Sequence, residues 1–243
     1  MLILRRIGYG ILGLLLFAAL VLAGWYQIDG QPLPETEAFL AEPGFDFLAE
    51  PDGGLLFTPH EPNGHGLMIM HGALIKPQSY AKTAAYFAAR GYLVYLPSGP
   101  ARLSIAAVDS AAARLAELGM DDWFFIGHSM GGLASMTLLD NYPINVKAVA
   151  LWAAAMPVDL SHIEVPTLFL WGDKDGLLTM GRFTAGRLHL PAQTTSIKML
   201  AGANHRDFAM YSHQFFDNEG LLGWEQQIDL ANEMTAEFFT KHF

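Results

Sequence analysis

Residues 123–132 read WFFIGHSMGG and determine the expected fold. The apolar residues at 123–126 predict a buried strand, and apolar residues recur at helical spacing from 133 to 139. The turn between them fits G-x-S-x-G, a pattern that places a serine on a sharp strand-to-helix turn with its hydroxyl exposed. The flanking residues must be small, because the strand and the helix approach each other closely there. The stretch therefore predicts a nucleophilic serine, Ser129.

An acidic loop and a histidine follow in the order that such a serine needs. Residues 172–176 read GDKDG after one predicted strand, and His205 follows the last one. Both positions lie at carboxyl ends of strands, the edge where ligands bind in open α/β sheets. A serine hydroxyl needs a neutral imidazole to accept its proton and a carboxylate to fix the imidazole tautomer. We expect Ser129, His205 and either Asp173 or Asp175 to form a catalytic triad. Gly176 favours Asp175, because it allows a sharp turn after it.

Two backbone N–H groups are expected to form the oxyanion hole. One belongs to Met130, the residue after the serine, and the other to Ala73. Residues 71–74 read HGAL and directly follow a predicted strand at 66–70. Gly72 and the small Ala73 would let the backbone approach a substrate.

The rest of the chain alternates between strands and helices. Strands are predicted at 45–48, 55–57, 66–70, 92–97, 123–126, 146–152, 167–171 and 194–200. Helices are predicted at 77–90, 104–118 and 224–239, and the last is amphipathic, with Ile228 and Ala231 on its apolar face. The first two strands are expected to pair antiparallel. The alternation predicts one α/β domain over residues 45–243, with a doubly wound, mostly parallel sheet.

Composition excludes several classes of function. The 243 residues carry 14 Lys and Arg against 24 Asp and Glu, a net charge of −10. Nucleic-acid binding, which needs a basic surface, is therefore not expected. The absence of cysteine excludes a thiolate nucleophile, disulfides and Cys-based metal sites. His60, His65 and His71 do not have metal-ligand spacing, so neither a metal nor a cofactor is expected.

The N-terminal residues suggest a membrane anchor. Residues 7–28 carry no charge and follow Arg5 and Arg6, which predicts a single transmembrane helix with a cytoplasmic N-terminus and an extracytoplasmic domain. The alternative is a cleaved signal peptide and a secreted or periplasmic product. Residues 1–28 would then be the anchor in the lipid bilayer or the signal peptide. Residues 29–44, rich in proline and acidic residues, would be a tether.

Ordered motifs over residues 66 to about 241 resemble the α/β-hydrolase superfamily and, within it, α/β hydrolase family 5. The shared motifs are GHSMGG at 127–132, LWA at 151–153, GDKDG at 172–176, Asn204-His205 and EQQ at 225–227. The resemblance implies a serine hydrolase and places the triad acid third after Gly172, at Asp175. The chain has His71-Gly72-Ala73 where the group often has Pro-Gly-Gly, a departure that concerns the shape of the pocket.

The short connection between Trp152 and Thr167, 14 residues long, leaves no room for a lid domain. We therefore expect an open, shallow site with an apolar mouth, and candidate lining residues are Leu74, Met130, Trp152, Met156, Leu177 and Phe208. Such a mouth suits a small-molecule carboxylic ester. Thioester or amide hydrolysis by the same triad is an alternative. A membrane-tethered, non-catalytic binding module of the same fold is another, although an intact triad argues against it.

Overall fold

The computed structural model describes residues 2–243, and within them one sheet contains eight strands in the order β1-β2-β4-β3-β5-β6-β7-β8. The strands are β1 (Phe45–Ala49), β2 (Leu55–Pro59), β3 (Gly66–Met70), β4 (Leu93–Leu96), β5 (Trp123–His128), β6 (Val146–Trp152), β7 (Thr167–Gly172) and β8 (Thr195–Leu200). β2 pairs antiparallel with β1 and β4, and every other pairing in the sheet is parallel. The predicted α/β architecture is confirmed.

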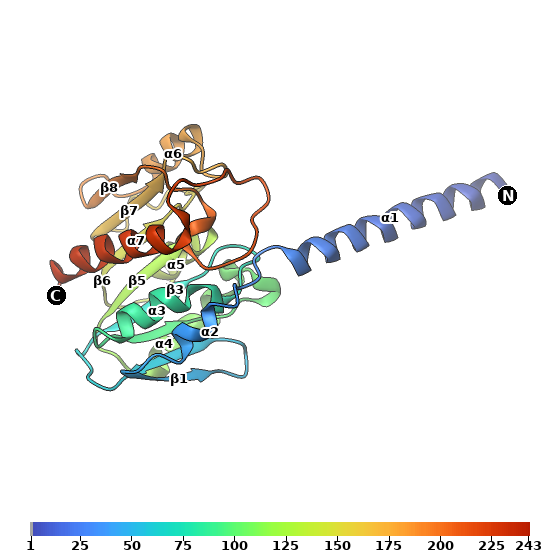
Figure 1. The fold of residues 1–243 in the computed structure, drawn as a ribbon. Helices are drawn as coiled ribbons and strands as arrows, with labels where there is room; N and C mark the ends of the chain where they lie inside the picture. Colours follow the sequence, from blue (N-terminus) through green and yellow to red (C-terminus); the bar gives the residue numbers. More distant parts are fainter. Residues whose placement is uncertain (1) are drawn as a thin grey trace.

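Helices cover both faces of the sheet (Figure 1). The helices of the described residues are α1 (Leu2–Ile28), α2 (Thr36–Leu40), α3 (Ala81–Ala88), α4 (Val108–Leu118), α5 (Met130–Asn141), α6 (Met180–Gly186) and α7 (Gly223–Thr240), of which α1 does not cover the sheet. Buried residues of α3 and α7 belong to one apolar core cluster, whereas those of α4 and α5 belong to a second. The sheet thus separates two cores, as in a doubly wound fold.

The packing of the central strand β5 explains why residues 123–126 are all apolar. Phe124 and Ile126 point into the first core, and Trp123 and Phe125 point into the second. Successive side chains of a strand alternate between faces, so a strand covered on both sides needs apolar residues at every position. All six residues of β5 are buried.

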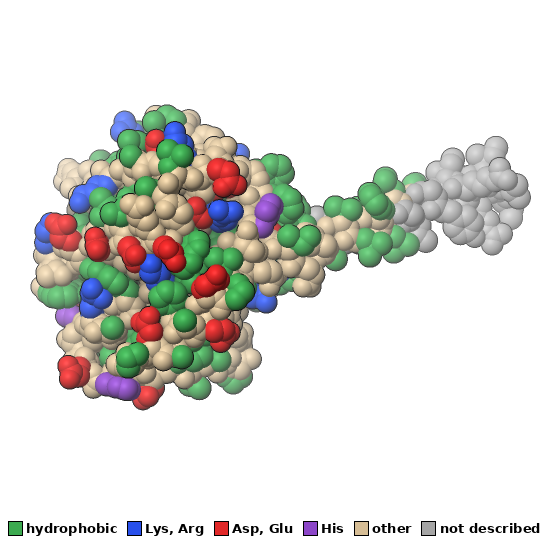
Figure 2. All heavy atoms as spheres, in the orientation of Figure 1, with side chains coloured by type: hydrophobic (Ala, Val, Ile, Leu, Met, Phe, Trp, Pro, Cys, Tyr) green, Lys and Arg blue, Asp and Glu red, His purple; other side chains and the backbone are tan. Residues whose placement is uncertain are grey.

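The predicted transmembrane helix is wrong. Among the residues that the structure describes, no helix combines the length and the apolar character that crossing a membrane requires. Figure 1 shows α1 projecting from the domain, and Figure 2 shows exposed apolar side chains along its described part. Its last turn packs onto the domain, where Trp25 meets Phe215 edge to face with ring centroids 5.4 Å apart. The C-terminal end of α1 is therefore part of the folded body, whereas the sequence suggested a membrane anchor or a signal peptide.

Residues 25–33, which we call the N-terminal strap, lie against three loops of the domain. The buried Asp29 carboxylate accepts hydrogen bonds from Trp25 Nε1 at 3.0 Å and from the Phe215 N–H at 3.3 Å. The Gly30 carbonyl accepts one from the Lys76 N–H at 3.3 Å. Arg102 donates to the Asp29 carbonyl at 3.1 Å. The strap therefore joins loops that follow three different strands of the sheet.

Candidate active site

Ser129 stands at the sharp turn between β5 and α5 in a strained backbone conformation, with φ 53° and ψ −120°. Positive φ is costly for a residue with a Cβ, and such strain persists only where the surrounding structure enforces it. The Ser129 N–H donates to the Trp152 carbonyl at 2.9 Å. A Cβ on Gly127 would lie 2.6 Å from the Gly131 carbonyl oxygen, which explains the requirement for glycine there. The turn has the geometry that G-x-S-x-G predicts.

His205 and Asp175 form a buried pair. His205 Nδ1 lies 2.9 Å from Asp175 Oδ2, and Asp175 Oδ1 accepts the N–H groups of Leu177 at 2.8 Å and Leu178 at 2.6 Å. Because the carboxylate only accepts, His205 carries its proton on Nδ1 and leaves Nε2 free to act as a base. Within residues 2–243 no hydrogen bond joins Nε2 to Ser129 Oγ, and such bonds are often long before substrate binds.

Asp173, the other candidate acid, is engaged elsewhere. Its Oδ1 accepts the Gly202 N–H at 2.6 Å, and its Oδ2 lies 3.7 Å from Lys174 Nζ. These contacts hold the loop after β7 against the loop after β8. The structure thus brings Asp175, and not Asp173, to His205.

The loop after β3 leaves one N–H available for an oxyanion. Gly72 donates to Tyr80 Oη at 2.9 Å, and Leu74 donates to the Arg102 carbonyl at 2.7 Å. Among the described residues the Ala73 N–H has no acceptor. Met130 opens α5, so its N–H has no partner within the helix. These are the two donors that the sequence selected.

Two further histidines near Ser129 are buried and neutral. Burial lowers the pKa of His71 to about 4, opposed by its hydrogen bond to the Gly72 carbonyl. Burial, followed by the neighbouring His205, lowers the pKa of His128 well below its usual range. Each ring can therefore donate through one nitrogen and accept through the other.

Two side chains that the sequence did not assign to the site hold its loops together. The Asp217 carboxylate accepts the Gly176 N–H at 2.9 Å and the Arg206 N–H at 2.7 Å, which ties the residues following Asp175 and His205 to one group. Gln227 of α7 bonds the N–H and the carbonyl of Asn204, at 3.0 and 2.9 Å. The sequence signal for such a role was a glutamine one turn before Ala231 of the apolar helix face, and the structure shows that this glutamine is fully buried. Asp217 offered no comparable signal.

The predicted lining residues fall into two groups. Leu74, Met130 and Leu177 are partly exposed beside the site, whereas Trp152 and Phe208 are fully buried in the core beneath it, their ring centroids 5.8 Å apart. Met156 lines a separate cavity of about 440 Å³. The segment between β6 and β7 contains neither helix nor strand, in agreement with the expected lack of a lid.

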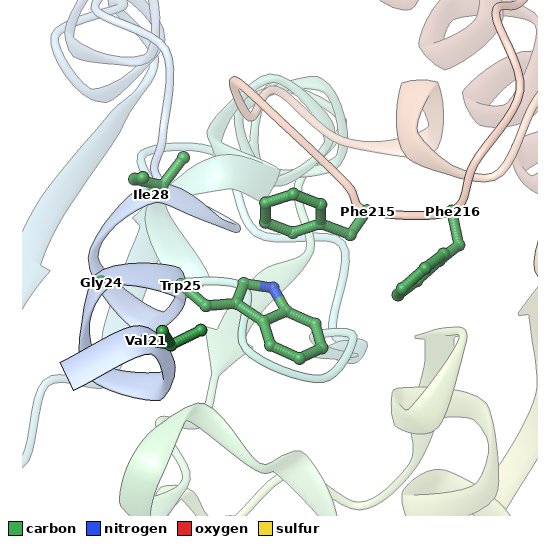
Figure 3. Close-up of a pocket in the computed structure, with 6 residues that line it drawn as sticks. All are labelled: Val21, Gly24, Trp25, Ile28, Phe215 and Phe216. Carbon is green, nitrogen blue, oxygen red and sulfur yellow. The ribbon is translucent and has the colours of Figure 1, made fainter. Parts of the chain in front are cut away.

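An apolar groove of about 380 Å³ lies where the end of α1 meets the loop that follows His205. It is lined by Val21, Gly24, Trp25, Ile28, Phe215 and Phe216. In Figure 3 the indole of Trp25 lies between α1 and the two phenylalanines. Phe216 is also the residue whose carbonyl oxygen leaves no space for a Cβ on Gly176, directly after Asp175. The groove therefore borders the loop that carries the acid.

Known proteins provide an independent comparison. No curated protein sequence matches the chain. A CIB-like hydrolase from Thermoplasma acidophilum has a similar structure, with 18% identity, a TM-score of 0.59 and coverage of 80% of this chain and 96% of that one. The propionate-bound esterase Est2 from Thermogutta terrifontis has 14% identity, a TM-score of 0.59 and coverage of 86% and 96%. The same esterase phosphoramylated by tabun has 14% identity, a TM-score of 0.54 and coverage of 80% and 95%.

These structural likenesses, at low identity, support the fold. The family itself is shown by the sequence, because the model described as "Alpha/beta hydrolase family" matches residues 66–229, more than half of the chain. The match includes Ser129, Asp175 and His205, and it confirms the resemblance that the ordered motifs suggested. The chain belongs to the alpha/beta hydrolase family.

Proposed function

We propose that this hydrolase cleaves small carboxylic esters through Ser129, Asp175 and His205. The observation that carries the proposal is the buried pairing of His205 Nδ1 with Asp175 Oδ2 at 2.9 Å, next to a serine held on a strained turn. Removing the alcohol proton, stabilising the imidazolium and exposing the nucleophile are the three requirements of acyl transfer by serine.

The proposed reaction has two steps, acylation of Ser129 and hydrolysis of the acyl-serine. In the first, His205 Nε2 takes the Ser129 hydroxyl proton as Oγ attacks the ester carbonyl, and the proton then passes to the departing alcohol. In the second, water attacks the acyl-serine, gives its proton to His205, and the carboxylic acid leaves as Ser129 regains its hydroxyl. The N–H groups of Ala73 and Met130 would bind the oxygen that becomes negative in both steps.

A covalent probe tests the nucleophile. The related Thermogutta terrifontis esterase is phosphoramylated by tabun, so a phosphorus-based reagent is a suitable choice. We expect a fluorophosphonate probe to label the wild-type protein and not Ser129→Ala, which should also lose turnover by several orders of magnitude. Ser161 is an exposed serine in the segment between β6 and β7. Ser161→Ala is the matched control and should be labelled like wild type.

The class of substrate is tested by measuring kcat/KM of the wild-type protein on several classes of substrate. A series of p-nitrophenyl esters of increasing acyl length, with a matched thioester and anilide, should show the highest kcat/KM for an ester. A preference for the thioester or the anilide would assign the alternative reactions. Unlabelled wild-type protein without turnover would contradict the proposal and favour a non-catalytic binding module.

A further inference from the structure

A chain of hydrogen bonds runs beneath the candidate active site, through groups to which the triad assigns no role. The Gly72 N–H donates to Tyr80 Oη at 2.9 Å, and Tyr80 Oη lies 2.7 Å from His128 Nδ1. On its other side the ring reaches the main chain of the candidate base, with His128 Nε2 3.1 Å from the His205 carbonyl oxygen. Tyr80 is 1% exposed and His128 is 0% exposed.

Only one arrangement of protons satisfies the whole chain. The Gly72 N–H can only donate and the His205 carbonyl can only accept. His128 therefore carries its proton on Nε2, and its Nδ1 must accept the hydroxyl proton of Tyr80. Burial raises the pKa of Tyr80 and lowers that of His128, so both groups stay neutral and keep this arrangement. Every polar atom of this hydrogen-bond chain, from the Gly72 N–H to the His205 carbonyl, is then paired, so the geometry of the hydrogen-bond chain is well defined.

The two ends of this hydrogen-bond chain lie at the two parts of the proposed active site, the oxyanion loop and the base. Gly72 directly precedes Ala73, whose N–H is a candidate oxyanion donor, and His205 is the candidate base. His128 itself directly precedes Ser129, and its ring packs on that of His205 with centroids 4.9 Å apart. The hydrogen-bond chain therefore links the oxyanion loop to the loop that carries the base through His128, the residue directly before the nucleophile.

We propose that Tyr80 and His128 are positioning residues, a bridge that sets the Ala73 N–H and His205 at the spacing that the transition state needs. The proposal rests on the proposed function, because it assigns the bridge to that same site. Small misplacements of groups that act in the transition state reduce turnover strongly, even when substrate binding is unchanged. The bridge should therefore govern kcat, and not KM.

Three substitutions separate the two ends of the bridge. Tyr80→Phe removes the hydroxyl that joins Gly72 to His128 and keeps the ring. His128→Asn places an amide near the Nδ1 position and loses the donor to His205. His128→Gln extends an amide to the Nε2 position and can restore that donor. Tyr142→Phe removes an exposed hydroxyl, bonded to Asp109 at 2.8 Å, and is the matched control.

We expect Tyr80→Phe and His128→Asn to lower kcat on an activated ester by at least about tenfold with KM changed less than about threefold. Affinity for an arylboronic acid, which forms a tetrahedral adduct with a serine, should fall in parallel, and affinity for the carboxylate product should not. His128→Gln, which regains the bond to His205 but not the bond from Tyr80, should recover part of kcat, and Tyr142→Phe should resemble wild type. If Tyr80→Phe does not fold, the comparison of the two His128 variants decides.

Both variants are measured well below their melting temperatures. If Tyr80→Phe and His128→Asn then have the kcat and the boronate affinity of wild type, the bridge is overturned, even if both variants melt at lower temperatures than wild type. The same holds if His128→Gln is no better than His128→Asn. Failure of the proposed function looks different, because wild-type protein would then show no turnover and Ser129 would not label, and the bridge would be overturned with it.

Discussion

Two carboxylates separated by one residue do different work in the loop after β7. Asp175 is buried and directs one oxygen to His205 and the other to two backbone N–H groups. Asp173 accepts one N–H, from Gly202, at the edge of the same loop. An asparagine at position 173 could still accept the Gly202 N–H through its amide oxygen. An asparagine at position 175 has only one acceptor oxygen, so if that oxygen accepts the His205 Nδ1–H, its NH₂ group faces the N–H groups of Leu177 and Leu178. The two positions should therefore differ in their tolerance of asparagine.

We expect Asp175→Asn to lower kcat at least roughly a hundredfold, about 2.7 kcal/mol in the activation barrier, and Asp173→Asn to lower it less than about tenfold. Steady-state kinetics of both variants on one activated ester measure the difference. The reverse order would assign the acid to Asp173, and two nearly normal variants would remove this loop from the triad.

His71 makes stability depend on pH. Its Nδ1 lies 2.8 Å from the Gly72 carbonyl, and its Nε2 accepts the Gly99 N–H at 3.4 Å, so the native state holds the neutral ring. Its pKa is about 4 in the folded protein and 6.5 when unfolded. Between these values the unfolded state binds more protons, and stability is therefore full above pH 6.5 and is lost as pH falls toward 4.

This pKa difference corresponds to about 3 kcal/mol of unfolding free energy. Urea unfolding at several pH values should show a shallower loss of stability between pH 6.5 and 4 in His71→Asn than in wild type. His60→Asn, at an exposed histidine, is the control and should follow the wild-type slope. Parallel curves for His71→Asn and wild type would contradict the assignment.

Most strands and long helices were predictable, because their patterns are local. Apolar runs such as 123–126 and 146–152 match β5 and β6 within two residues. The five-residue α2 and the seven-residue α6 were not predicted, since so few residues carry no clear periodicity. In the site, the order of the motifs located Ser129 and His205, whereas Asp217 and the hydrogen bonds of Tyr80 depend on tertiary contacts that no local pattern encodes.

The N-terminal strap is the element that the sequence described least well. Gly30 has φ +65° and its backbone lies directly on the Leu74 carbonyl, so a Cβ there would overlap that oxygen. Leu74 itself adopts φ 63° in the loop that carries Ala73. The strap therefore packs directly against the candidate oxyanion loop. A substitution in the strap should consequently change the position of that loop in the active site.

We expect Gly30→Ala to lower kcat at least about tenfold, because the oxyanion loop must move to admit the methyl group. Gly64→Ala is the matched control, since Gly64 has φ +90° and no atom near its Cβ position. It carries the backbone strain without the collision and should retain activity. Equal activity of the two variants would show that the strap does not act on the loop. Melting temperatures of both should be measured alongside.

At the scale of the whole molecule, we expect activity to depend on where the N-terminal part of the chain is shortened, because the strap begins at the end of α1. A chain shortened to begin at Gly24 keeps Trp25, Asp29 and Gly30, whereas one shortened to begin at Gln31 loses the contacts to Phe215, Lys76 and Arg102. We expect turnover close to the full chain from the first, and a loss of at least about tenfold in kcat from the second.

The control for this pair is probe labelling of Ser129, which reports that the nucleophile is still presented. Equal turnover of the two shortened chains would show that the strap is dispensable. Loss of turnover in the chain that begins at Gly24 would assign a role to the earlier turns of α1.

The contact between Asp29 and Phe215 spans 186 residues of sequence, so during biosynthesis it can form only after Phe215 has been added. At about 5–20 residues per second, a ribosome needs roughly 10–40 s to add the residues that separate the two. Late in that interval, after Ser129 and before His205 have been added, the nascent polypeptide has its nucleophile turn but neither the histidine nor the loop that contacts its N-terminal portion. If the contact of the strap with Phe215 is needed for activity, hydrolysis should begin only after Phe215 has been added.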